Sequence, residues 1–301
     1  MSLNRKTLNN LTESEWLTER TKYLTSTDIS AIFGLSPYKT KAEVWHQKKS
    51  GDIVQIEDND FMKWGRRAEP MVAEGIAEDQ GWKVRPFKEF IALTECGIAS
   101  SFDYLIEEPH KAILEIKCVG EMAFKNQWSP VDNEAPLHIE LQVQHQMLVS
   151  GVDRCFIGAF VGGNSTEIIE RVADKNIHAR ILEESAAFWK SIEAGTPPAF
   201  DFDRDADFVA ALYGHAEPGS LIDSNETIDA LALRYKEAAE AERDAKKIKD
   251  ATKAELLTLI GDAEKCKGEQ FTISAGMVGE AEIKFTRKPY RNFRISFRKE
   301  K

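Results

Sequence analysis

One short segment constrains the fold more than any other. Residues Ala112–Val119 read AILEIKCV and are apolar at most positions. Successive side chains of a strand point to opposite faces, so this run predicts a strand that is largely buried. A second apolar stretch, Ile98–Ile106, precedes it, and five residues separate the two. This spacing predicts a β-hairpin.

Helical and strand-like patterns alternate on both sides of this hairpin. Thr27 is the expected N-cap of a helix that stops at Gly34, and Thr40 is the expected N-cap of the next helix, which stops at Gly51. The alternation predicts an α/β fold with a mixed central β-sheet flanked by helices. The further predicted helices are Phe61–Asp79, Leu137–Val149 and Asn176–Glu193, and the further predicted strands are Trp82–Leu93, Cys155–Val161 and a short one around Ile168.

The composition changes near residue 205. Gly195–Pro198 interrupts the helical pattern and an acidic stretch follows, so we predict one domain at residues 1–205 and an extension at residues 206–301. Ile228–Ile260 is rich in Ala, Glu and Lys and predicts one long helix or a helical hairpin. It lacks a sustained apolar heptad, so no coiled coil is predicted. Gly268–Phe297 alternates in the manner of strands, which makes the extension helical and β.

Three charged side chains lie on the predicted hairpin. Glu115 and Lys117 are two residues apart and therefore share one face of their strand, while Asp103 comes from the partner strand. The short connection brings all three to one end of the sheet. An acid and a lysine on a largely buried strand are unusual unless they are paired or functional. The alternative is that all three are ordinary surface residues of amphipathic strands.

Two carboxylates beside an ammonium group suit the hydrolysis of phosphodiester bonds. Hard oxygen ligands suit Mg²⁺ or Mn²⁺, which polarises a phosphoryl oxygen and lowers the pKa of a bound water. A neighbouring lysine can orient that water and offset the charge that develops on phosphorus. Mg²⁺ usually takes only one or two protein carboxylates. The sequence therefore predicts a metal-dependent nuclease site at Asp103, Glu115 and Lys117.

Several motifs resemble a known family. Asp103 followed by Glu115-Ile116-Lys117 on a hairpin resembles the core of the PD-(D/E)XK nucleases, although Phe102 stands where that core usually has proline. Further motifs resemble the YqaJ-type viral recombinases, relatives of the phage lambda exonuclease. They run in family order over about residues 14–195, and no resemblance extends beyond residue 205. These motifs are Trp16 with Arg20, Thr25-Ser26-Thr27-Asp28, Gly34-Leu35-Ser36-Pro37-Tyr38, Trp64-Gly65 with Glu69-Pro70, and Gln142-Val143-Gln144-His145-Gln146-Met147.

The resemblance implies a restriction-endonuclease-like core and roles for further residues at the site. Glu69 is expected near the metal, as an additional ligand or to hold water, and the Ile116 backbone carbonyl is expected to be a further ligand. Gln142 is expected to hydrogen-bond the attacking water or a phosphate. Glutamines two residues apart do not share a helix face, so Gln144 is not expected there. The alternative for Glu69 and Gln142 is an ordinary polar residue of a helix.

A second group of residues is expected to bind the 5′-phosphate of a DNA end. Arginine contacts phosphate through two parallel hydrogen bonds, which favours Arg20. A hydroxyl group at a helix N-terminus suits an anion, which favours Thr27, with Ser26 as its alternative. Thr27 could equally be a simple N-cap, and Arg20 could form a surface ion pair.

The resemblance implies a Mg²⁺-dependent exonuclease that hydrolyses double-stranded DNA from its ends, 5′ to 3′, in phage-type recombination or repair. It also implies a single-strand annealing protein as partner and a homotrimer. The alternatives are a structure-specific or sequence-specific DNA endonuclease and a DNA-end-binding protein without catalysis. The extension at residues 206–301 is expected to dock a partner or DNA.

The charge of the chain is unexpected for a protein that handles DNA. Its formal net charge is −10, so contacts to phosphate must come from local basic groups. The segment Lys284–Lys301 holds eight basic residues and one acid. Its mixture of basic and aromatic residues suits nucleic acid, and it also suits an ordinary strand with basic residues outward. Four widely spaced cysteines, without an apolar leader or membrane span, predict free thiols in the cytoplasm.

Overall fold

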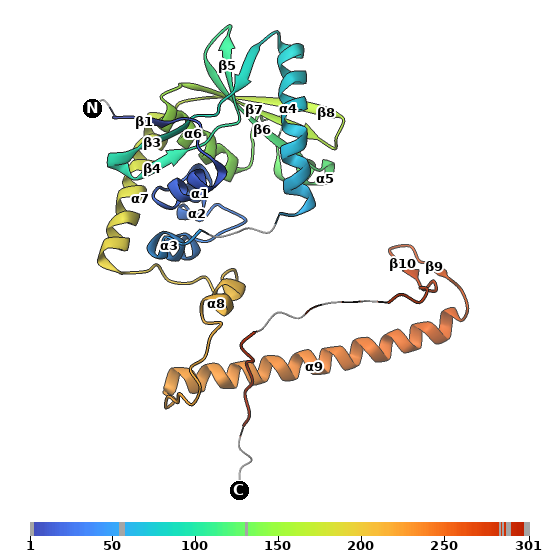
Figure 1. Ribbon diagram of the computed structural model, residues 1–301. Coiled ribbons are helices and arrows are strands. Elements are labelled where there is room, and N and C mark those ends of the chain that lie inside the picture. Colours follow the sequence, from blue (N-terminus) through green and yellow to red (C-terminus); the bar gives the residue numbers. More distant parts are fainter. Residues whose placement is uncertain are drawn as a thin grey trace. The chain divides into compact units, whose positions relative to one another are not determined.

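The chain forms two compact units, Met1–Phe208 and Val209–Lys301. The computed structural model (Figure 1) describes residues 3–53, 58–129, 132–282, 284, 286 and 290–297. The division between the units falls inside helix α8 (Ala206–Leu212), close to the boundary predicted at residue 205.

A five-stranded sheet forms the centre of the first unit. Its strand order is β2-β5-β6-β7-β8. Strands β6 and β7 are parallel, and the other neighbours are antiparallel, so the sheet is mixed, as predicted. The strands are β2 (Lys83–Pro86), β5 (Tyr104–Glu108), β6 (Ala112–Val119), β7 (Arg154–Val161) and β8 (Ser165–Val172).

Helices cover both faces of this sheet (Figure 1). On one face, Ile113 of β6 packs in a buried cluster with side chains of α2, α3, α6 and α7. On the other face, Leu114 and Ile116 pack against α4. Strand β6 is therefore buried on both faces, which confirms the prediction from its apolar run. The helices of the unit are α1 (Glu13–Thr21), α2 (Ser26–Ile32), α3 (Lys41–Ser50), α4 (Asp60–Gln80), α5 (Glu121–Gln127), α6 (Leu137–Ser150) and α7 (Lys175–Ala194).

A glycine of the sheet leaves room for a side chain of α4. A Cβ atom at Gly158 of β7 would lie 2.6 Å from Ile76 Cδ1 on α4. A larger residue at this position would displace the Ile76 side chain. This contact matters for the site because α4 also carries Glu69.

Two of the predicted strands are each divided between two sheets. Ile98–Ile106 forms β4 (Ile98–Ser100) and then β5, and Trp82–Leu93 forms β2 and then β3 (Phe90–Leu93). Strands β3 and β4 join β1 (Lys6–Leu8) in a separate three-stranded sheet. The prediction of two continuous strands was wrong because an apolar pattern identifies a strand without identifying its partner.

The helix caps follow the sequence closely, with one exception. Thr40 caps α3, its hydroxyl oxygen accepting from the Glu43 backbone N–H, and α3 ends at Gly51, as predicted. Thr27 is not the N-cap of α2, because the helix begins at Ser26 and Thr25 occupies the cap position. The Asp28 carboxylate accepts from the backbone N–H and the hydroxyl of Thr25. This contact begins the helix two residues earlier than predicted.

The second unit contains one long helix, α9 (Glu226–Ile260), followed by the short antiparallel strands β9 (Lys265–Lys267) and β10 (Thr272–Ser274). The alternative of a helical hairpin is therefore wrong. Beyond β10 the described residues do not continue as strands, contrary to the prediction for Gly268–Phe297. Of the basic tail, Arg291 and Arg294 are described, whereas Arg287, Lys288 and Arg298 lie outside the described residues.

All four cysteines have free thiols, as predicted. Across the described parts of the chain, no helix has both the length and the apolar character that crossing a bilayer requires.

Candidate active site

The hairpin β5–β6 brings the predicted acids together. Tyr104 pairs with Leu114, so Asp103, one residue before β5, comes beside Glu115. The Asp103 carboxylate oxygen Oδ2 accepts a hydrogen bond of 2.8 Å from the backbone N–H of Ile116. The two carboxylates therefore lie next to each other at one end of the hairpin.

Glu115 is the centre of a hydrogen-bonded cluster. Its side chain is almost completely buried, and its Oε1 atom lies 2.6 Å from Lys117 Nζ. The same oxygen accepts from Gln142 Nε2 at 2.5 Å, and Oε2 accepts from Gln146 Nε2 at 2.7 Å. Lys117 Nζ also donates to Gln142 Oε1 at 3.2 Å. The acid, the lysine and two glutamines are thus held in one arrangement.

Helix α6 supplies the glutamines from one face. Gln142 and Gln146 are four residues apart and both reach Glu115, whereas Gln144 points elsewhere. Gln144 Nε2 donates to the Val172 carbonyl, and its Oε1 accepts from the backbone N–H of Asp174. The sequence reasoning selected Gln142 over Gln144 but missed Gln146, although the spacing of four residues could have identified it.

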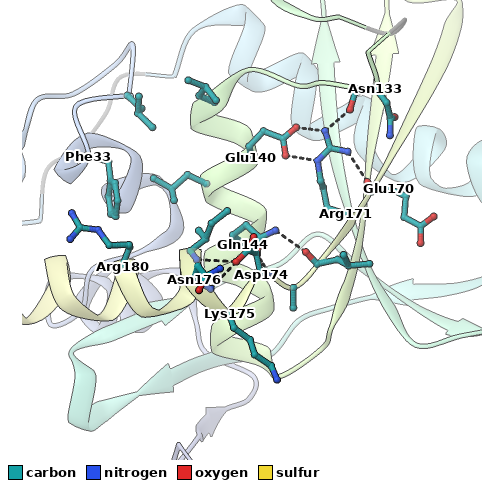
Figure 2. Close-up of a pocket in the computed structure, with 16 residues that line it drawn as sticks. Phe33, Asn133, Glu140, Gln144, Glu170, Arg171, Asp174, Lys175, Asn176 and Arg180 are labelled. Atoms are coloured by element: carbon teal, nitrogen blue, oxygen red, sulfur yellow. Dashed lines mark hydrogen bonds and ion pairs between the residues drawn. The ribbon is translucent and has the colours of Figure 1, made fainter.

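Gln144 instead lines a separate cavity of this unit (Figure 2). That cavity, of about 1180 Å³, lies among α6, β8 and the start of α7. At its wall, Arg171 donates to both carboxylate oxygens of Glu140. Asp103, Glu115 and Lys117 are not among its lining residues. The acid–lysine cluster therefore lies outside this cavity.

The charges of the cluster act strongly on one another. Burial and the neighbouring Glu115 carboxylate raise the pKa of Asp103 well above its usual range, against the opposing effect of Lys117. Burial would lower the pKa of Lys117, but Glu115 and Asp103 outweigh it and raise that pKa. The lysine therefore stays protonated beside the two acids.

Glu69 of α4 lies within electrostatic reach of the same cluster. Its side chain is half-buried, and burial together with the Glu115 charge raises its pKa. Lys117 acts on it in the opposite direction. The structure thus brings Glu69 toward the hairpin acids, although no described side chain holds it against them in a hydrogen bond.

The donor set suits a hard divalent cation. Three carboxylates, those of Glu69, Asp103 and Glu115, share the neighbourhood of one ammonium group. A divalent cation would compensate the excess negative charge, and carboxylate oxygens are ligands that Mg²⁺ and Mn²⁺ prefer. Within the described residues, no three His, Cys, Asp or Glu side chains are already close enough to hold a metal. Ligation would therefore rest on one or two carboxylates with water, and on the Ile116 carbonyl.

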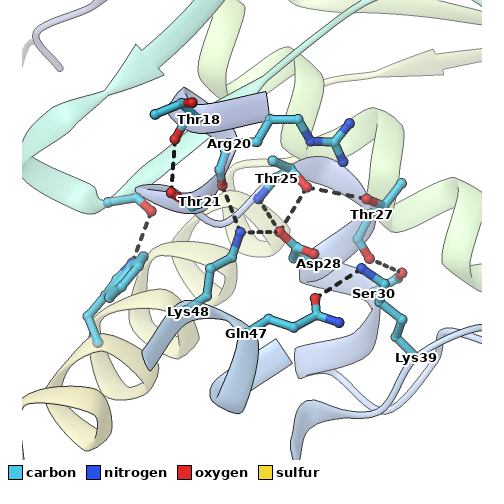
Figure 3. Close-up of polar contacts among 12 residues, drawn as sticks. Thr18, Arg20, Thr21, Thr25, Thr27, Asp28, Ser30, Lys39, Gln47 and Lys48 are labelled. Carbon is cyan, nitrogen blue, oxygen red and sulfur yellow. Dashed lines mark hydrogen bonds and ion pairs between the residues drawn. The ribbon is translucent and has the colours of Figure 1, made fainter. Parts of the chain in front are cut away.

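Arg20 lies in a second cluster, which lines a cavity of about 590 Å³ (Figure 3). Its guanidinium group stacks over the Trp16 ring at 4.5 Å. Lys39 and Lys48 line the same cavity, and Lys48 Nζ lies 2.9 Å from the buried carboxylate of Asp28. These three cations surround a single buried acid and leave an excess of positive charge. The more exposed lining residues include Glu13, Asp52, Asp58 and Arg66.

The pKa values of this cluster reflect the excess of positive charge. Burial would raise the pKa of Asp28, but Lys48 and Lys39 lower it to about 2. Burial lowers the pKa of Arg20 and of Lys48, against the opposing charge of Asp28. Partly desolvated cations are poised to accept an anion, because charge attraction is stronger where water is excluded.

The other two residues predicted to bind the 5′-phosphate, Ser26 and Thr27, lie outside the cavity that contains Arg20. Ser26 is buried in the first turn of α2, and Thr27 is exposed, with its Oγ1 atom 3.2 Å from Thr25 Oγ1. Neither lines the cavity that contains Arg20. Lys39 and Lys48 do, and sequence reasoning missed both. Their proximity to Arg20 depends on the packing of α3 against α2, which no local pattern records.

Comparisons with known proteins show what this chain is similar to. Residues 15–153 match the model of the YqaJ-like viral recombinase domain. The chain is 28% identical over 269 residues to the uncharacterized protein YqaJ of Bacillus subtilis (strain 168), and the match covers 85% of this chain and 83% of that protein.

Solved structures show a weaker likeness. An alkaline exonuclease from Laribacter hongkongensis matches with a TM-score of 0.48 and 21% identity, over 65% of this chain and 100% of that one. A phage-related exonuclease from Haemophilus somnus 129PT matches with a TM-score of 0.45 and 15% identity, over 57% of this chain and 94% of that one.

The matched residues contain the whole acid–lysine cluster. Glu69, Asp103, Glu115, Lys117 and Gln142 all lie within the family domain, in the order in which the motifs occur along the sequence. Over these residues the chain is therefore similar to the YqaJ-like viral recombinase domain, and over most of its length it is similar to the YqaJ protein.

Proposed function

We propose that this protein is a metal-dependent deoxyribonuclease that degrades double-stranded DNA from its ends, 5′ to 3′. The observation that carries the proposal is the arrangement of Glu115, whose carboxylate is held by Lys117, Gln142 and Gln146 beside Asp103. The match of residues 15–153 to a viral recombinase domain supports a role in recombination. A single-strand annealing protein is the partner that we propose for it.

Each residue of the cluster would have its own role in hydrolysis. Asp103, Glu115 and the Ile116 carbonyl would hold Mg²⁺ or Mn²⁺, with Glu69 as a further ligand or a holder of water. When bound, the metal would polarise the phosphoryl oxygen and lower the pKa of water. Lys117, already fixed by Glu115 and Gln142, would orient the attacking water and offset charge on phosphorus. Gln142 would position that water or a phosphate oxygen.

The cluster of Arg20, Lys39 and Lys48 at the second cavity supports recognition of a DNA end. Arg20, Lys39 and Lys48 line a space that fits a phosphate group, and a terminal 5′-phosphate carries more negative charge than an internal phosphodiester. Binding of that terminus would favour ends over internal bonds and would set the direction as 5′ to 3′. Ser26 and Thr27 would contribute only through the N-terminus of α2.

Two DNA forms test the mode of action. With Mg²⁺ or Mn²⁺, we expect digestion of end-labelled linear duplex from the 5′ end, while a covalently closed circle stays intact. Chelation of the metal by EDTA should stop digestion. Cleavage of the closed circle would indicate an endonuclease, and binding without cleavage in both metals would indicate a DNA-end-binding protein.

Substitutions in the cluster test the site. Glu115→Ala and Lys117→Ala should each lower the rate of cleavage at least about 1000-fold while DNA is still bound, because they remove metal ligation and charge stabilisation. Lys111→Ala, in the exposed turn of the same hairpin, is the control and should retain full activity. Substantial cleavage by Glu115→Ala or Lys117→Ala would show that the site is misassigned.

Arg20 tests the recognition of the end. In the wild type a 5′-phosphorylated duplex should be digested faster than a 5′-hydroxyl duplex, and Arg20→Ala should remove that difference. Lys39→Ala should reduce it in the same direction. Equal slowing on both substrates would place Arg20 in general binding of the DNA backbone instead.

A further inference from the structure

Tyr38 is an exposed aromatic residue to which the proposed function gives no role. Its side chain is 82% exposed, and it lies in the short connection between α2 and α3. The ring contacts that of His138 at the start of α6, with the centroids 6.1 Å apart and the planes at 85°. Because so much of Tyr38 is exposed, the contact with His138 leaves most of its surface free for another group.

Hydrogen bonds fix the backbone that carries Tyr38. The hydroxyl oxygen of Ser36, a buried residue, accepts from the backbone N–H of Tyr38 at 3.1 Å and from that of Lys39 at 3.2 Å. Lys39 Nζ in turn donates to Gln47 Oε1 of α3 at 3.2 Å. The connection is therefore held at its centre, and it presents the Tyr38 side chain to solvent from a fixed position.

Tyr38 and His138 both lie within electrostatic reach of Lys117. Burial would lower the pKa of Lys117, whereas the two hairpin acids and, more weakly, Tyr38 raise it. Burial lowers the pKa of His138, and the Lys117 charge acts in the same direction. Together with the contact between the two rings, this places an uncharged aromatic pair beside the acid–lysine cluster.

Two elements connect this place to the cavity that contains Arg20. In the connection between α2 and α3, Lys39 lines that cavity and the preceding residue is Tyr38. On α4, Arg66 lines the cavity, and Glu69, about one helical turn later, lies within electrostatic reach of the acid–lysine cluster. The cavity and the cluster are therefore neighbours, and Tyr38 stands at their junction.

We propose that Tyr38, supported by His138, binds the base of the nucleotide at the 5′ end of the strand that is digested. This inference rests on the proposed function, in which the terminal phosphate binds near Arg20 and the bond to be cut lies at Lys117. The nucleoside between these two phosphate groups would then lie against Tyr38. Aromatic stacking is favourable with every base, so it suits an exonuclease that must accept each base in turn.

Binding to a modified DNA end tests this contact. In EDTA, the wild type should bind a 5′-phosphorylated duplex with a one-nucleotide 5′ overhang about tenfold more tightly than the same duplex with an abasic overhang, because the stacking of one base is lost. Tyr38→Ala should bind both duplexes with the affinity that the wild type has for the abasic one. Tyr38→Phe keeps the aromatic ring and should keep the tenfold difference.

Leu35→Ala is the matched control for this measurement. Leu35 is an exposed residue of the same connection but lines a different cavity, so the tenfold difference should persist in this variant. Equal affinity of the wild type for the two duplexes, or a tenfold difference that survives in Tyr38→Ala, would overturn the proposal.

His138 is tested as a positioning residue, because it acts through Tyr38. His138→Ala should reduce the difference between the two duplexes, and His138→Phe, which keeps a ring beside Tyr38, should restore it. Equal losses in both variants would overturn the supporting role of His138. These binding measurements need no hydrolysis, so they are separate from the proposed function: absence of cleavage in Mg²⁺ or Mn²⁺ would refute the nuclease, whereas loss of the base preference alone would refute the role of Tyr38.

Discussion

Glu115 is only 2% exposed in the fold, so protein groups must replace the water that its carboxylate loses. Lys117, Gln142 and Gln146 supply those groups. A buried charge with several donors is fixed in direction as well as compensated. At the scale of a single residue, the contacts that compensate the buried charge of Glu115 also fix the direction of its carboxylate beside Asp103.

Gln146 is a positioning residue in this arrangement. Gln146→Ala removes the hydrogen bond to Glu115 Oε2, and we expect kcat to fall about 10-fold to 100-fold with little change in KM for DNA. Gln144→Ala is the control on the same helix, because Gln144 contacts Val172 and Asp174 instead, and its kcat should be unchanged. Equal losses of kcat in both variants would indicate general damage to α6.

His145 should make stability depend on pH. It is fully buried, its ring nitrogens have no hydrogen-bond partner among the described residues, and its pKa is lowered to about 3. Burial is the main cause, His178 acts in the same direction, and Asp28 opposes it. The folded ring is neutral, whereas the unfolded ring takes up a proton below its ordinary pKa of 6.5. The stabilisation is therefore complete above that value and is lost as the pH falls toward 3.

Denaturant unfolding at pH 7 and pH 5 measures this contribution. The wild type should lose about 2 kcal/mol more of its free energy of unfolding between these two pH values than His145→Leu does, since each pH unit below the unfolded pKa contributes about 1.4 kcal/mol. The comparison between the two proteins removes the contribution of all other titrating groups. Identical pH dependence would show that His145 takes up a proton in the folded protein.

At the scale of elements, a buried ion pair joins α2 to α3. The side chains of Asp28 and Lys48 are 5% and 8% exposed, and Lys48 Nζ also donates to the Arg20 carbonyl at 2.8 Å. The pair thus connects the two helices and the end of α1. This junction holds Arg20 and Lys48 together at the cavity, so its integrity is a condition for the recognition of a DNA end that we propose.

Removing one member of that pair should be costly. Lys48→Met leaves the Asp28 carboxylate buried without its nearest cation, and we expect the free energy of unfolding to fall by about 3 kcal/mol or more. The double variant Asp28→Asn with Lys48→Met should be destabilised by less than the sum of the two single changes. Lys49→Met, next to it but in an exposed contact with the Ile192 carbonyl, is the control and should change stability by less than about 1 kcal/mol.

At the scale of the whole molecule, the acidic segment at the end of the first unit packs against α3. Asp205 is fully buried and accepts from the Thr40 hydroxyl at the start of α3. Nearby, the Phe200 ring stacks on His46 at 5.7 Å. The residues up to Phe208 therefore complete the packing around α3, although their acidic sequence resembles a linker.

Two shortened chains measure how much this segment contributes. A chain that ends at residue 208 keeps these contacts, and a chain that ends at residue 199 loses them. We expect the shorter chain to melt about 5–10 °C lower, because a buried charged hydrogen bond and an aromatic contact are lost. Equal melting temperatures by circular dichroism would mean that the unit is complete at residue 199.

Local sequence patterns were sufficient to place the charged residues of the hairpin. The apolar run of β6 predicted burial on both faces, and the two-residue spacing of Glu115 and Lys117 placed them on one face. Helical geometry, which is local, also showed that Gln142 and Gln144 cannot face the same site, whereas the choice of Gln142 came from the resemblance to a known family. These features depend on repeats of two to four residues, which are visible in any stretch of the chain.

Which distant elements meet can be seen only in the tertiary structure. In the structure, Ile98–Ile106 is divided between two sheets, and Gln146 of α6 reaches Glu115 of β6. Lys39 and Lys48 line the same cavity as Arg20. Each of these contacts joins segments whose separation along the chain carries no periodic signal. Local patterns reflect the geometry of one strand or helix, whereas the partner of that element is selected by the packing of the whole core.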